Sequence, residues 1–325
     1  MKVFGTRLHT ARVISGLSLQ GLSDAIGNIV SKQSMSMYES GLMEPRRRTL
    51  NAIADALGVS VNYFYKGIDE IDVPQLRTSI PNAISQDEMS ELESSILFLA
   101  DRIDNKQRLL NMRQEFSCSL RHLPISGTES ATVLADRLRE EWTCGDGPVP
   151  SMLRLLERHG IWVFDLVLPD GVLGVSTWVD GNCPLIVLDT REEKTTVERL
   201  RFTAAHELAH LLFKVPEGLD PERMCNLFAS YFLLPKNTLI QELGTKRDSI
   251  YLEELIDLRQ YYGVSVAAIV HEAYDFGIIS REHYDYWYDT LIKHNVKEAG
   301  WGTYVFPETL GKERRMEVRI EKGDK

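Results

Sequence analysis

The sequence predicts an α+β protein in which an all-helical N-terminal region precedes a domain that combines helices with a small sheet. Two observations support this prediction. Residues 1–66 contain short apolar-periodic segments separated by tight turns, which is typical of small helices. Residues 161–189 hold three short β-branched stretches, flanked on both sides by helical patterns. The 325 residues are enough for about two domains that each bury a core.

The composition is that of an ordinary soluble protein, with 43% hydrophobic and 26% charged residues. No apolar run approaches the roughly 18–20 residues of a membrane span. The N-terminus lacks the apolar core and small-residue cleavage site of a signal peptide. The four cysteines lie far apart without a CxxC pair, so we expect free thiols in a reducing compartment. We therefore expect a cytoplasmic protein with no membrane contact.

The charge is distributed unevenly along the chain. The net charge is −10, yet residues 1–66 hold eight Lys/Arg against four Asp/Glu, and the remainder holds 29 against 43. A basic N-terminal region followed by an acidic remainder is expected when only the N-terminal region binds nucleic-acid phosphate.

The elements follow in order after the helical head. Residues 67–87 carry two prolines and no clear period, which predicts a linker. From Met89 to Ile103 the apolar residues recur every three and four positions, as in a heptad seam. That seam either packs on its own domain or forms a dimer contact. Helices are expected near 129–142 and 150–159.

The strand-like stretches are separated by short turns, which predicts a small antiparallel meander. Residues 194–276 again have helical patterns, so the second domain spans 88–281. A C-terminal extension covers 282–325, with aromatic residues suited to packing. Its charged end, 312–325, is expected to fray. The three predicted strands are 161–167, 172–179 and 184–189.

The segment around His206, Glu207 and His210 has the spacing of a metal site. Two histidines four residues apart on a helix point the same way, and zinc favours imidazole nitrogen. Glu207 is suited to accept a proton from a water molecule rather than to bind the ion. The alternative is a pair of histidines on a solvated helix face.

The surroundings of this motif favour a helix with two distinct faces. Thr195 and Glu198 have the spacing of a capping box. His206, His210 and Thr203 fall on the side opposite the apolar positions, so one face can pack while the other lines a cleft. The apolar positions are Val197, Leu200, Ala204, Leu208 and Leu211.

A catalytic zinc site needs a third protein ligand and an open position. Downstream, Asp220 and Pro221 have the pattern of a helix N-cap followed by a first helical proline. Glu222 lies in the first turn of that helix. By chemistry alone, Glu217, Asp220 and Cys225 compete with it for the third position.

Two sequence motifs carry a family resemblance. RFTAAHELAHLLF followed by ERMCNLFASYFLLP resembles the ImmA/IrrE family of zinc metallopeptidases, and the similarity extends over roughly 128–281. The resemblance implies a thermolysin-like zincin fold, with Zn²⁺ as the cofactor. It implies ligands at His206, His210 and Glu222, and Glu207 as general base. Ala209 departs from the family pattern, which usually has glycine there.

Cleavage of a peptide would also need a group that stabilises the developing oxyanion. Tyr261, Tyr262 and His271 are candidates, because they lie in a segment that could close over a cleft. Each is equally compatible with packing in the core or on the surface.

The N-terminal region contains a second candidate site. Ser18 is expected to cap a helix whose buried positions are Leu22, Ala25 and Ile26. A turn then leads to a second helix, with Met35 inward along with Tyr38. The residues expected to face DNA are Ser31, Lys32, Gln33, Ser34 and Met37 on that helix, and Arg46, Arg47 and Arg48 at the start of the next.

This stretch resembles the helix-turn-helix family of phage Cro and repressor proteins, also called the XRE family. VSKQSMSMYESG aligns without gaps on the recognition helix of that family. Two departures are a turn that is two residues longer, at residues 27–31, and Leu19 where the family often has a phosphate-contacting glutamine. The resemblance implies binding to a double-stranded DNA operator, and one such unit per chain suggests a homodimer. The same fold also serves protein contacts alone.

The two resemblances together indicate a regulatory zinc endopeptidase that its own DNA-binding domain directs to DNA. The ImmA/IrrE resemblance implies cleavage of a repressor-like helix-turn-helix protein in response to stress, DNA damage or mobile elements. The target is such a partner or the chain's own linker at 67–87. One alternative is a non-proteolytic, antitoxin-like regulator with a structural or sensory zinc and an adjacent toxin as partner. Another is metal-dependent hydrolysis of a non-peptide bond.

Overall fold

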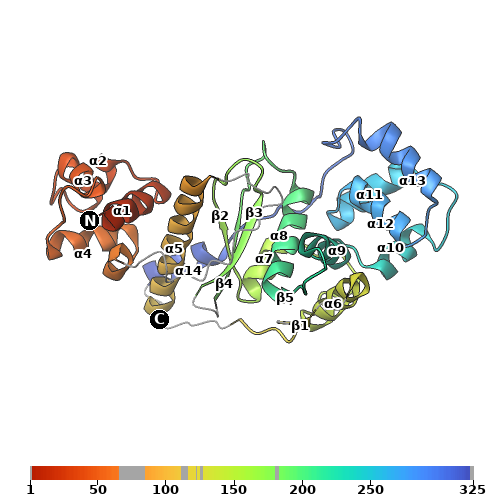
Figure 1. Ribbon diagram of the computed structural model, residues 1–325, viewed down its shortest axis with the longest axis horizontal. Helices are drawn as coiled ribbons and strands as arrows, with labels where there is room; N and C mark the ends of the chain where they lie inside the picture. Colours follow the sequence, from red (N-terminus) through yellow and green to blue (C-terminus); the bar gives the residue numbers. More distant parts are fainter. Residues whose placement is uncertain are drawn as a thin grey trace.

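A computed structural model describes residues 2–65, 85–110, 116–121, 123–124, 127–179 and 183–322. Within these residues the molecule is elongated. A small helical unit lies at one end, a three-stranded sheet in the centre and a group of helices at the other end (Figure 1). The predicted linker at 67–87 falls almost entirely outside the described residues. No described helix combines the length and the apolarity needed to cross a membrane.

The N-terminal unit is all-helical, as the sequence predicts. Ser18 caps its second helix by accepting from Gly21 N at 2.9 Å, and Leu22 and Ile26 are buried. Ala25, expected in the core, is exposed instead. Its elements are α1 (Lys2–Ile14), α2 (Leu19–Ala25), α3 (Lys32–Glu39), α4 (Arg47–Leu57) and the 3₁₀ helix η1 (Val61–Tyr65).

The long turn between α2 and α3 explains why Ala25 is exposed rather than buried. Gly27 and Asn28 both adopt positive φ values, of 71° and 55°, so the chain reverses sharply after α2. The buried Ser23 then donates its hydroxyl to Val30 O at 2.6 Å. The inner position of α2 is therefore a serine that ties down the turn, and the alanine faces outward.

The predicted seam lies on α5 (Gln86–Leu109), and it is buried within the chain. Leu92, Ile96, Leu99 and Ile103 all belong to one core cluster with residues of α1 and η1. Asp101 accepts from the backbone N of Ser60 at 2.5 Å and from its hydroxyl at 2.9 Å. The seam is therefore used for packing inside one chain, against the N-terminal unit.

The central sheet is mixed rather than an antiparallel meander. Its order is β2-β4-β3, with β4 parallel to β2 and antiparallel to β3. The meander prediction was wrong because β4 is buried along nearly its whole length, as a central strand must be, whereas β3 is only half-buried. The strands are β2 (Trp162–Asp165), β3 (Gly174–Val179) and β4 (Cys183–Leu188).

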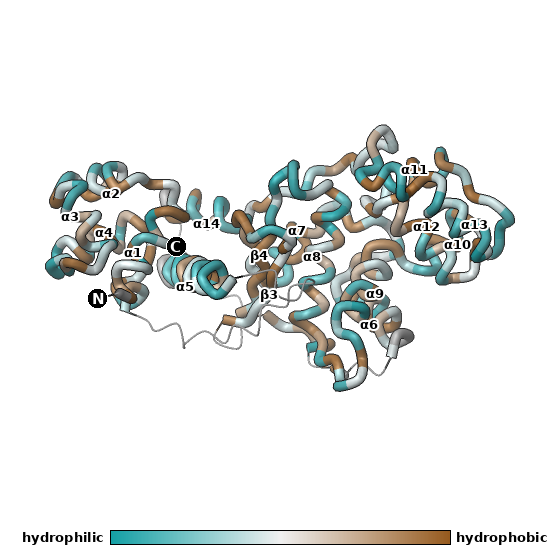
Figure 2. The backbone as a smooth tube through the Cα atoms, turned by 45° about the horizontal axis from the view of Figure 1, so that its top comes forward, coloured by the Kyte–Doolittle hydropathy of each residue, from teal (hydrophilic) through white to brown (hydrophobic). Residues whose placement is uncertain are grey.

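The two faces of the sheet contribute to two different cores. Val163, Ile186 and Leu188 pack with the helices of the second domain. Trp162 and Val187, on the other face, join the cluster that contains α5 and the N-terminal unit. The strand β4 is accordingly hydrophobic along much of its length (Figure 2). The sheet thus connects the core that contains the N-terminal unit and α5 with the core of the second domain.

The helix α8, which carries the HExxH motif, packs against α7, α9 and β3. A short parallel pair, β1 (Leu123–Pro124) with β5 (Phe213–Lys214), was not expected from the sequence. The helices are α6 (Thr128–Glu141), α7 (Met152–Arg158), α8 (Val197–Leu212), α9 (Pro221–Leu233), α10 (Lys236–Leu243), α11 (Leu252–Tyr262), α12 (Val266–Asp275), α13 (Arg281–Trp287) and the π-helix η3 (Tyr288–Ile292).

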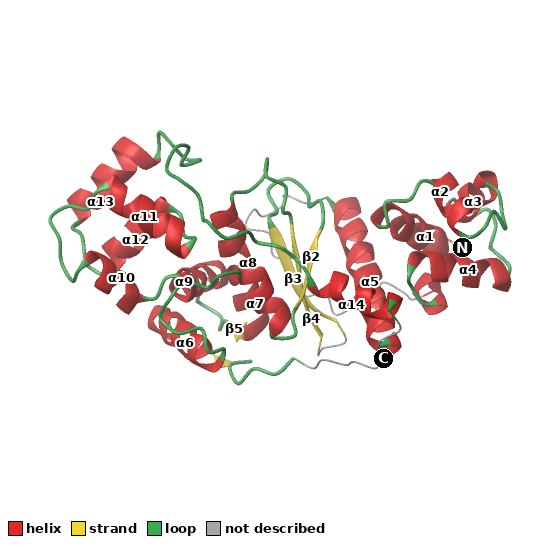
Figure 3. Cartoon of the chain, turned by 180° about the vertical axis from the view of Figure 1, so that it is seen from behind, coloured by secondary structure: helices red, strands yellow, loops and turns green. Residues whose placement is uncertain are grey.

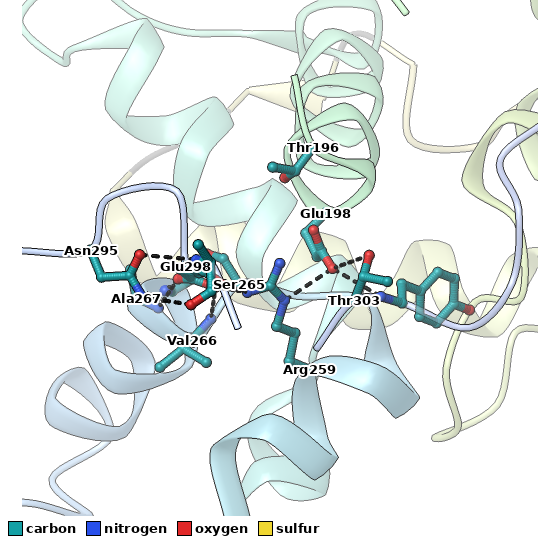
Figure 4. Close-up of polar contacts among 12 residues, drawn as sticks. Thr196, Glu198, Arg259, Ser265, Val266, Ala267, Asn295, Glu298 and Thr303 are labelled. Carbon is teal, nitrogen blue, oxygen red and sulfur yellow. Dashed lines mark hydrogen bonds and ion pairs between the residues drawn. The ribbon is translucent and has the colours of Figure 1, made fainter. Parts of the chain in front are cut away.

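The predicted capping box at the start of α8 was wrong. The N-cap is Thr196, whose hydroxyl accepts from Arg199 N. Glu198 points into the core instead, where its carboxylate accepts from Arg259 Nε at 3.0 Å and from Tyr304 N at 2.9 Å. A buried guanidinium attracts the carboxylate more strongly than a solvated backbone N–H does. Figure 4 shows this network at the foot of α8.

The charged C-terminal segment forms a helix, α14 (Lys312–Glu321), rather than a frayed end. It lies beside α5 (Figure 3). Lys106 donates to Glu313 at 2.5 Å and to Glu317 at 2.7 Å, and Arg102 pairs with Glu313 as well. The charges that suggested fraying are paired between two helices.

Candidate functional site

The two histidines of α8 converge on one carboxylate. His206 Nε2 lies 3.2 Å from Glu222 Oε2, and His210 Nε2 lies 3.4 Å from Glu222 Oε1. The two Nε2 atoms are 3.0 Å apart. The histidine side chains are only 13% and 16% exposed, so they do not form a solvated face. Among the described residues, these three form the one group whose ligand atoms could hold a metal ion together.

Glu222 reaches the histidines because of how α9 begins. Asp220 accepts from Glu222 N at 3.0 Å and also from Arg223 N, and Pro221 occupies the first turn, as the sequence predicts. The cap uses the Asp220 carboxylate, so this residue does not join the cluster. The hydrogen bonds to His206 and then to His210 outweigh burial and lower the pKa of Glu222 well below its usual value.

The outer nitrogens of both histidines have neighbours on α9. His206 Nδ1 lies 2.9 Å from Asn226 Oδ1. Because a carbonyl oxygen can only accept, Nδ1 donates to Asn226, and Nε2 is the nitrogen that faces Glu222 and is available to a metal ion. Cys225 Sγ lies 3.5 Å from His210 Nδ1. This cysteine, a competing third ligand in the sequence analysis, therefore lies behind His210 rather than beside Glu222.

Glu207 is held between α8 and β3. Its side chain is buried, and Oε2 accepts from the Ser176 hydroxyl at 2.6 Å. Gly174 is required by the close approach of the strand: a Cβ there would lie 2.6 Å from Thr203 Cγ2 and 3.0 Å from Glu207 Cγ. Ser176 and Gly174 were missed from the sequence, because nothing local in β3 indicates that it lies over α8.

Two cavities flank Glu207 along β3. The Arg199 cavity has a volume of about 200 Å³, and the Trp178 cavity about 220 Å³. Glu207 lines both, so the two lie end to end over α8. The Arg199 cavity is lined by Gly171, Val172, Leu173, Gly174, Arg199, Phe202, Thr203, His206, Glu207, Glu222 and Asn226. The Trp178 cavity is lined by Val175, Ser176, Thr177, Trp178, Glu207, His210, Leu211, Phe213, Lys214, Val215, Pro221 and Cys225.

The three oxyanion candidates line neither cavity. Tyr262 is buried and donates its hydroxyl to Glu242 Oε1 at 2.7 Å. Tyr261 is exposed, and His271 pairs with Asp275 on the surface of α12. The structure therefore does not bring these side chains to the His206–His210–Glu222 cluster.

The residues predicted to face DNA lie at α3 and at the start of α4, and all but the half-buried Ser34 are exposed. Ser31 caps α3 by accepting from Ser34 N, and Lys32, Gln33 and Met37 are exposed. Met35 and Tyr38 are buried, as expected. Arg46 is the N-cap residue of α4, and Arg46, Arg47 and Arg48 are all exposed. The arrangement leaves a polar helix face and three cations free to meet a phosphate backbone.

Comparison with known proteins matches both parts of the chain. Residues 156–274 match the family model described as an IrrE N-terminal-like domain, and residues 8–64 match a helix-turn-helix model. The SPβ prophage-derived uncharacterized HTH-type transcriptional regulator YonR of Bacillus subtilis is 34% identical over 98 residues, which is 28% of this chain and 89% of that protein.

An uncharacterized HTH-type transcriptional regulator of Rickettsia conorii is 32% identical over 71 residues, or 22% of this chain. A similar regulator of Rickettsia prowazekii has the same identity over the same length. The chain spans 55% and 53% of these two proteins.

Proposed function

The chain belongs to the helix-turn-helix transcriptional regulators and carries an IrrE-like domain, and on this basis we propose that it is a zinc-dependent endopeptidase directed to DNA. One observation carries the proposal: the His206–His210–Glu222 cluster and the buried Glu207 lie together beneath the open edge of a β-strand.

The geometry of the cluster fits zinc. Zinc binds histidine nitrogen and carboxylate oxygen at about 2.0–2.2 Å in a tetrahedron, which places the ligand atoms about 3.3 Å apart. The two Nε2 atoms are 3.0 Å apart, and they lie 3.2 and 3.4 Å from the two oxygens of the Glu222 carboxylate. Glu222 Oε1 is buried, and it lies 3.4 Å from His210 Nε2, the nitrogen with which it would share a cation. When bound, zinc acts as a Lewis acid and makes water a nucleophile near neutral pH.

The chain's own residues then supply proton transfer and orientation. Glu207 accepts the proton from the attacking water and returns it to the leaving amine. The Ser176 hydroxyl fixes the Glu207 carboxylate by donating to Oε2. Asn226 fixes the His206 ring through Nδ1. Each group is therefore held in place before a substrate arrives, which reduces the reorganisation needed in the transition state.

The strand β3 offers a binding edge for a peptide. It pairs with β4 on one side, and in the described sheet no strand covers its other side. An extended peptide can add to such an edge through main-chain hydrogen bonds. A peptide bound there passes directly over Glu207, because β3 lines both cavities that flank this residue. This arrangement favours hydrolysis of a peptide bond over other bonds.

The N-terminal unit would bring the peptidase to an operator. Lys32, Gln33 and Met37 are exposed and would meet base edges, and the exposed Arg46 to Arg48 would meet phosphates. The substrate we propose is a repressor-like helix-turn-helix protein bound nearby, or the chain's own linker at 67–87. The first cut would inactivate a DNA-binding repressor, and the second would separate the N-terminal DNA-binding unit from the peptidase domain.

The test is cleavage by the zinc-loaded full chain. We expect fragments of the chain itself, or of a repressor encoded beside it, with wild type but not with Glu207→Gln, and loss of cleavage when a chelator removes zinc. Identical fragment patterns for the two proteins with every candidate repressor would refute the proposal.

The names of the relatives favour a second function, that of a DNA-binding regulator without proteolysis. In that case zinc has a structural or sensory role. One bound zinc per chain with no cleavage of any substrate would support it. An intact Glu207 held by Ser176 weighs against it, because a structural site needs no base.

A further inference from the structure

Arg199 differs from the other arginines packed around α8. Arg201 is fully buried and pairs with Glu308, and Arg259 is buried between Glu198 and Glu298. Arg199 lines the cavity beside the His206–His210–Glu222 cluster, and its side chain is exposed. Within the described residues, no carboxylate lies at ion-pair distance from its guanidinium. Its closest aromatic neighbour is Phe202, with Arg199 Cζ 5.7 Å from the ring centroid.

Neither carboxylate that lines this cavity forms an ion pair with Arg199, and Glu207 accepts from the Ser176 hydroxyl instead. Glu222, the second carboxylate lining it besides Glu207, is directed to His206 and His210. A guanidinium presents a planar fork of donors that matches a carboxylate in two-point hydrogen bonding. An arginine that lines this cavity without a carboxylate partner is therefore suited to bind a carboxylate of the substrate.

The direction of β3 determines which part of a substrate Arg199 would meet. Gly174, at the start of β3, lines the Arg199 cavity, and Trp178, near its end, lines the other. A peptide added antiparallel to β3 enters at Trp178 and leaves at Gly174. Its residues after the cleaved bond consequently lie in the Arg199 cavity.

The spacing along α8 gives the approximate position. Arg199 precedes His206 by seven residues, which is about 10 Å of helix at about 1.5 Å per residue. An extended peptide advances about 3.3 Å per residue. Since α8 and β3 run side by side past both cavities, the second or third residue after the cleaved bond lies opposite Arg199.

We propose that Arg199 is a specificity residue that selects substrates with a carboxylate on the C-terminal side of the cleaved bond. That carboxylate is an aspartate or glutamate side chain at the second or third position, or the free C-terminus of a short substrate. This inference rests on the proposed peptidase function and deepens it.

The test uses the zinc-loaded full chain and a degenerate peptide library, with the cut sites read by mass spectrometry. Wild type should show Asp and Glu enriched at the second or third position after the cut. Arg199→Gln should lose that enrichment, and Arg199→Glu should replace it with Lys and Arg. Arg137→Gln is the matched control, because Arg137 is exposed on α6 and lines neither cavity.

Individual peptides then separate the two sources of the carboxylate. A Glu-containing peptide should be cleaved with a kcat/KM about tenfold above that of its Gln counterpart, which corresponds to one charge-assisted hydrogen-bonded pair. A free-acid peptide and its C-terminal amide, each ending three residues after the cut, test the second source. An acidic preference unchanged in Arg199→Glu, or no preference in wild type, would overturn the inference while leaving the peptidase function intact.

Binding provides a readout that does not depend on turnover. Fluorescence anisotropy of the labelled Glu and Gln peptides on Glu207→Gln should show about tenfold tighter binding of the Glu peptide, and equal binding once Arg199→Gln is added. Equal affinities on Glu207→Gln alone would refute the role of Arg199 even if no peptide were ever cleaved. Failure of every library peptide to be cut by wild type would instead count against the peptidase function.

Discussion

Replacement of Arg259 by alanine should destabilise the IrrE-like domain more than any surface arginine change. The guanidinium is 4% exposed and lies between two carboxylates that are 1% and 6% exposed (Figure 4). Its Nε is 3.0 Å from Glu198 Oε1 and its Nη1 is 2.6 Å from Glu298 Oε2. Glu298 in turn accepts from Val266 N and Ala267 N at the start of α12. Removing the Arg259 guanidinium leaves both buried carboxylates without their cation.

The expected cost follows from this burial. Breaking a buried ion pair by removing one partner costs about 3–5 kcal/mol, because the remaining charge is left uncompensated. For a domain of about 200 residues, each kcal/mol lowers Tm by about 2–4 °C. Arg259→Ala should therefore unfold about 10 °C below wild type, and Arg259→Lys should lie in between, because it keeps the charge but not the planar fork.

The assay is thermal unfolding followed by circular dichroism, with urea unfolding as a second probe. Arg281→Ala is the matched control, since its i,i+4 pair with Asp285 is largely exposed to solvent and contributes little to stability. If Arg259→Ala unfolded within about 1 kcal/mol of Arg281→Ala, the assignment of the network as the anchor of α8 would be wrong.

Three further predictions concern the site and its support. Gly174→Ala should leave zinc bound but lower kcat at least tenfold, because the added Cβ meets Thr203 Cγ2 at 2.6 Å; adding Thr203→Ser should restore part of the activity. Asn226→Ala should weaken zinc binding about 10- to 100-fold in a competitive chelator titration, since His206 loses the acceptor that orients its ring, and Asn226→Asp should retain tight binding. Burial raises the pKa of Glu272 well above its usual value, so the folded state holds a proton that the unfolded state releases above about pH 4.5. Stability should fall as pH rises, and Glu272→Gln should raise Tm at neutral pH but not below pH 4.5; equal shifts at both pH values would show that the carboxyl is not held protonated.

Local sequence patterns predicted that His206 and His210 lie together, whereas the choice of Glu222 over Glu217, Asp220 and Cys225 came from the family resemblance. The i,i+4 spacing of His206 and His210 places both on one face of α8. The Asp220–Pro221 start of α9 accounts for the position of Glu222 in a first turn. The inward and outward residues of α3 followed equally from helical periodicity, with Met35 buried and Lys32 exposed.

What the sequence left undetermined depends on long-range packing. The strand order β2-β4-β3 reflects a core on both faces of β4, which periodicity within one strand does not reveal. Glu198 had the spacing of a capping residue, but its partner Arg259 lies 61 residues away. Ser176 reaches Glu207 across 31 residues. The helical C-terminus likewise depends on α5, whose cations pair with Glu313 and Glu317.

The most direct test of the account is the zinc content of the purified full chain after dialysis against a weak chelator. We predict about one zinc per chain for wild type, for Glu207→Gln and for Cys225→Ser, and none for His210→Ala or Glu222→Ala. Zinc retained by Glu222→Ala, or lost from Cys225→Ser alone, would contradict the assignment of His206, His210 and Glu222 as the ligands.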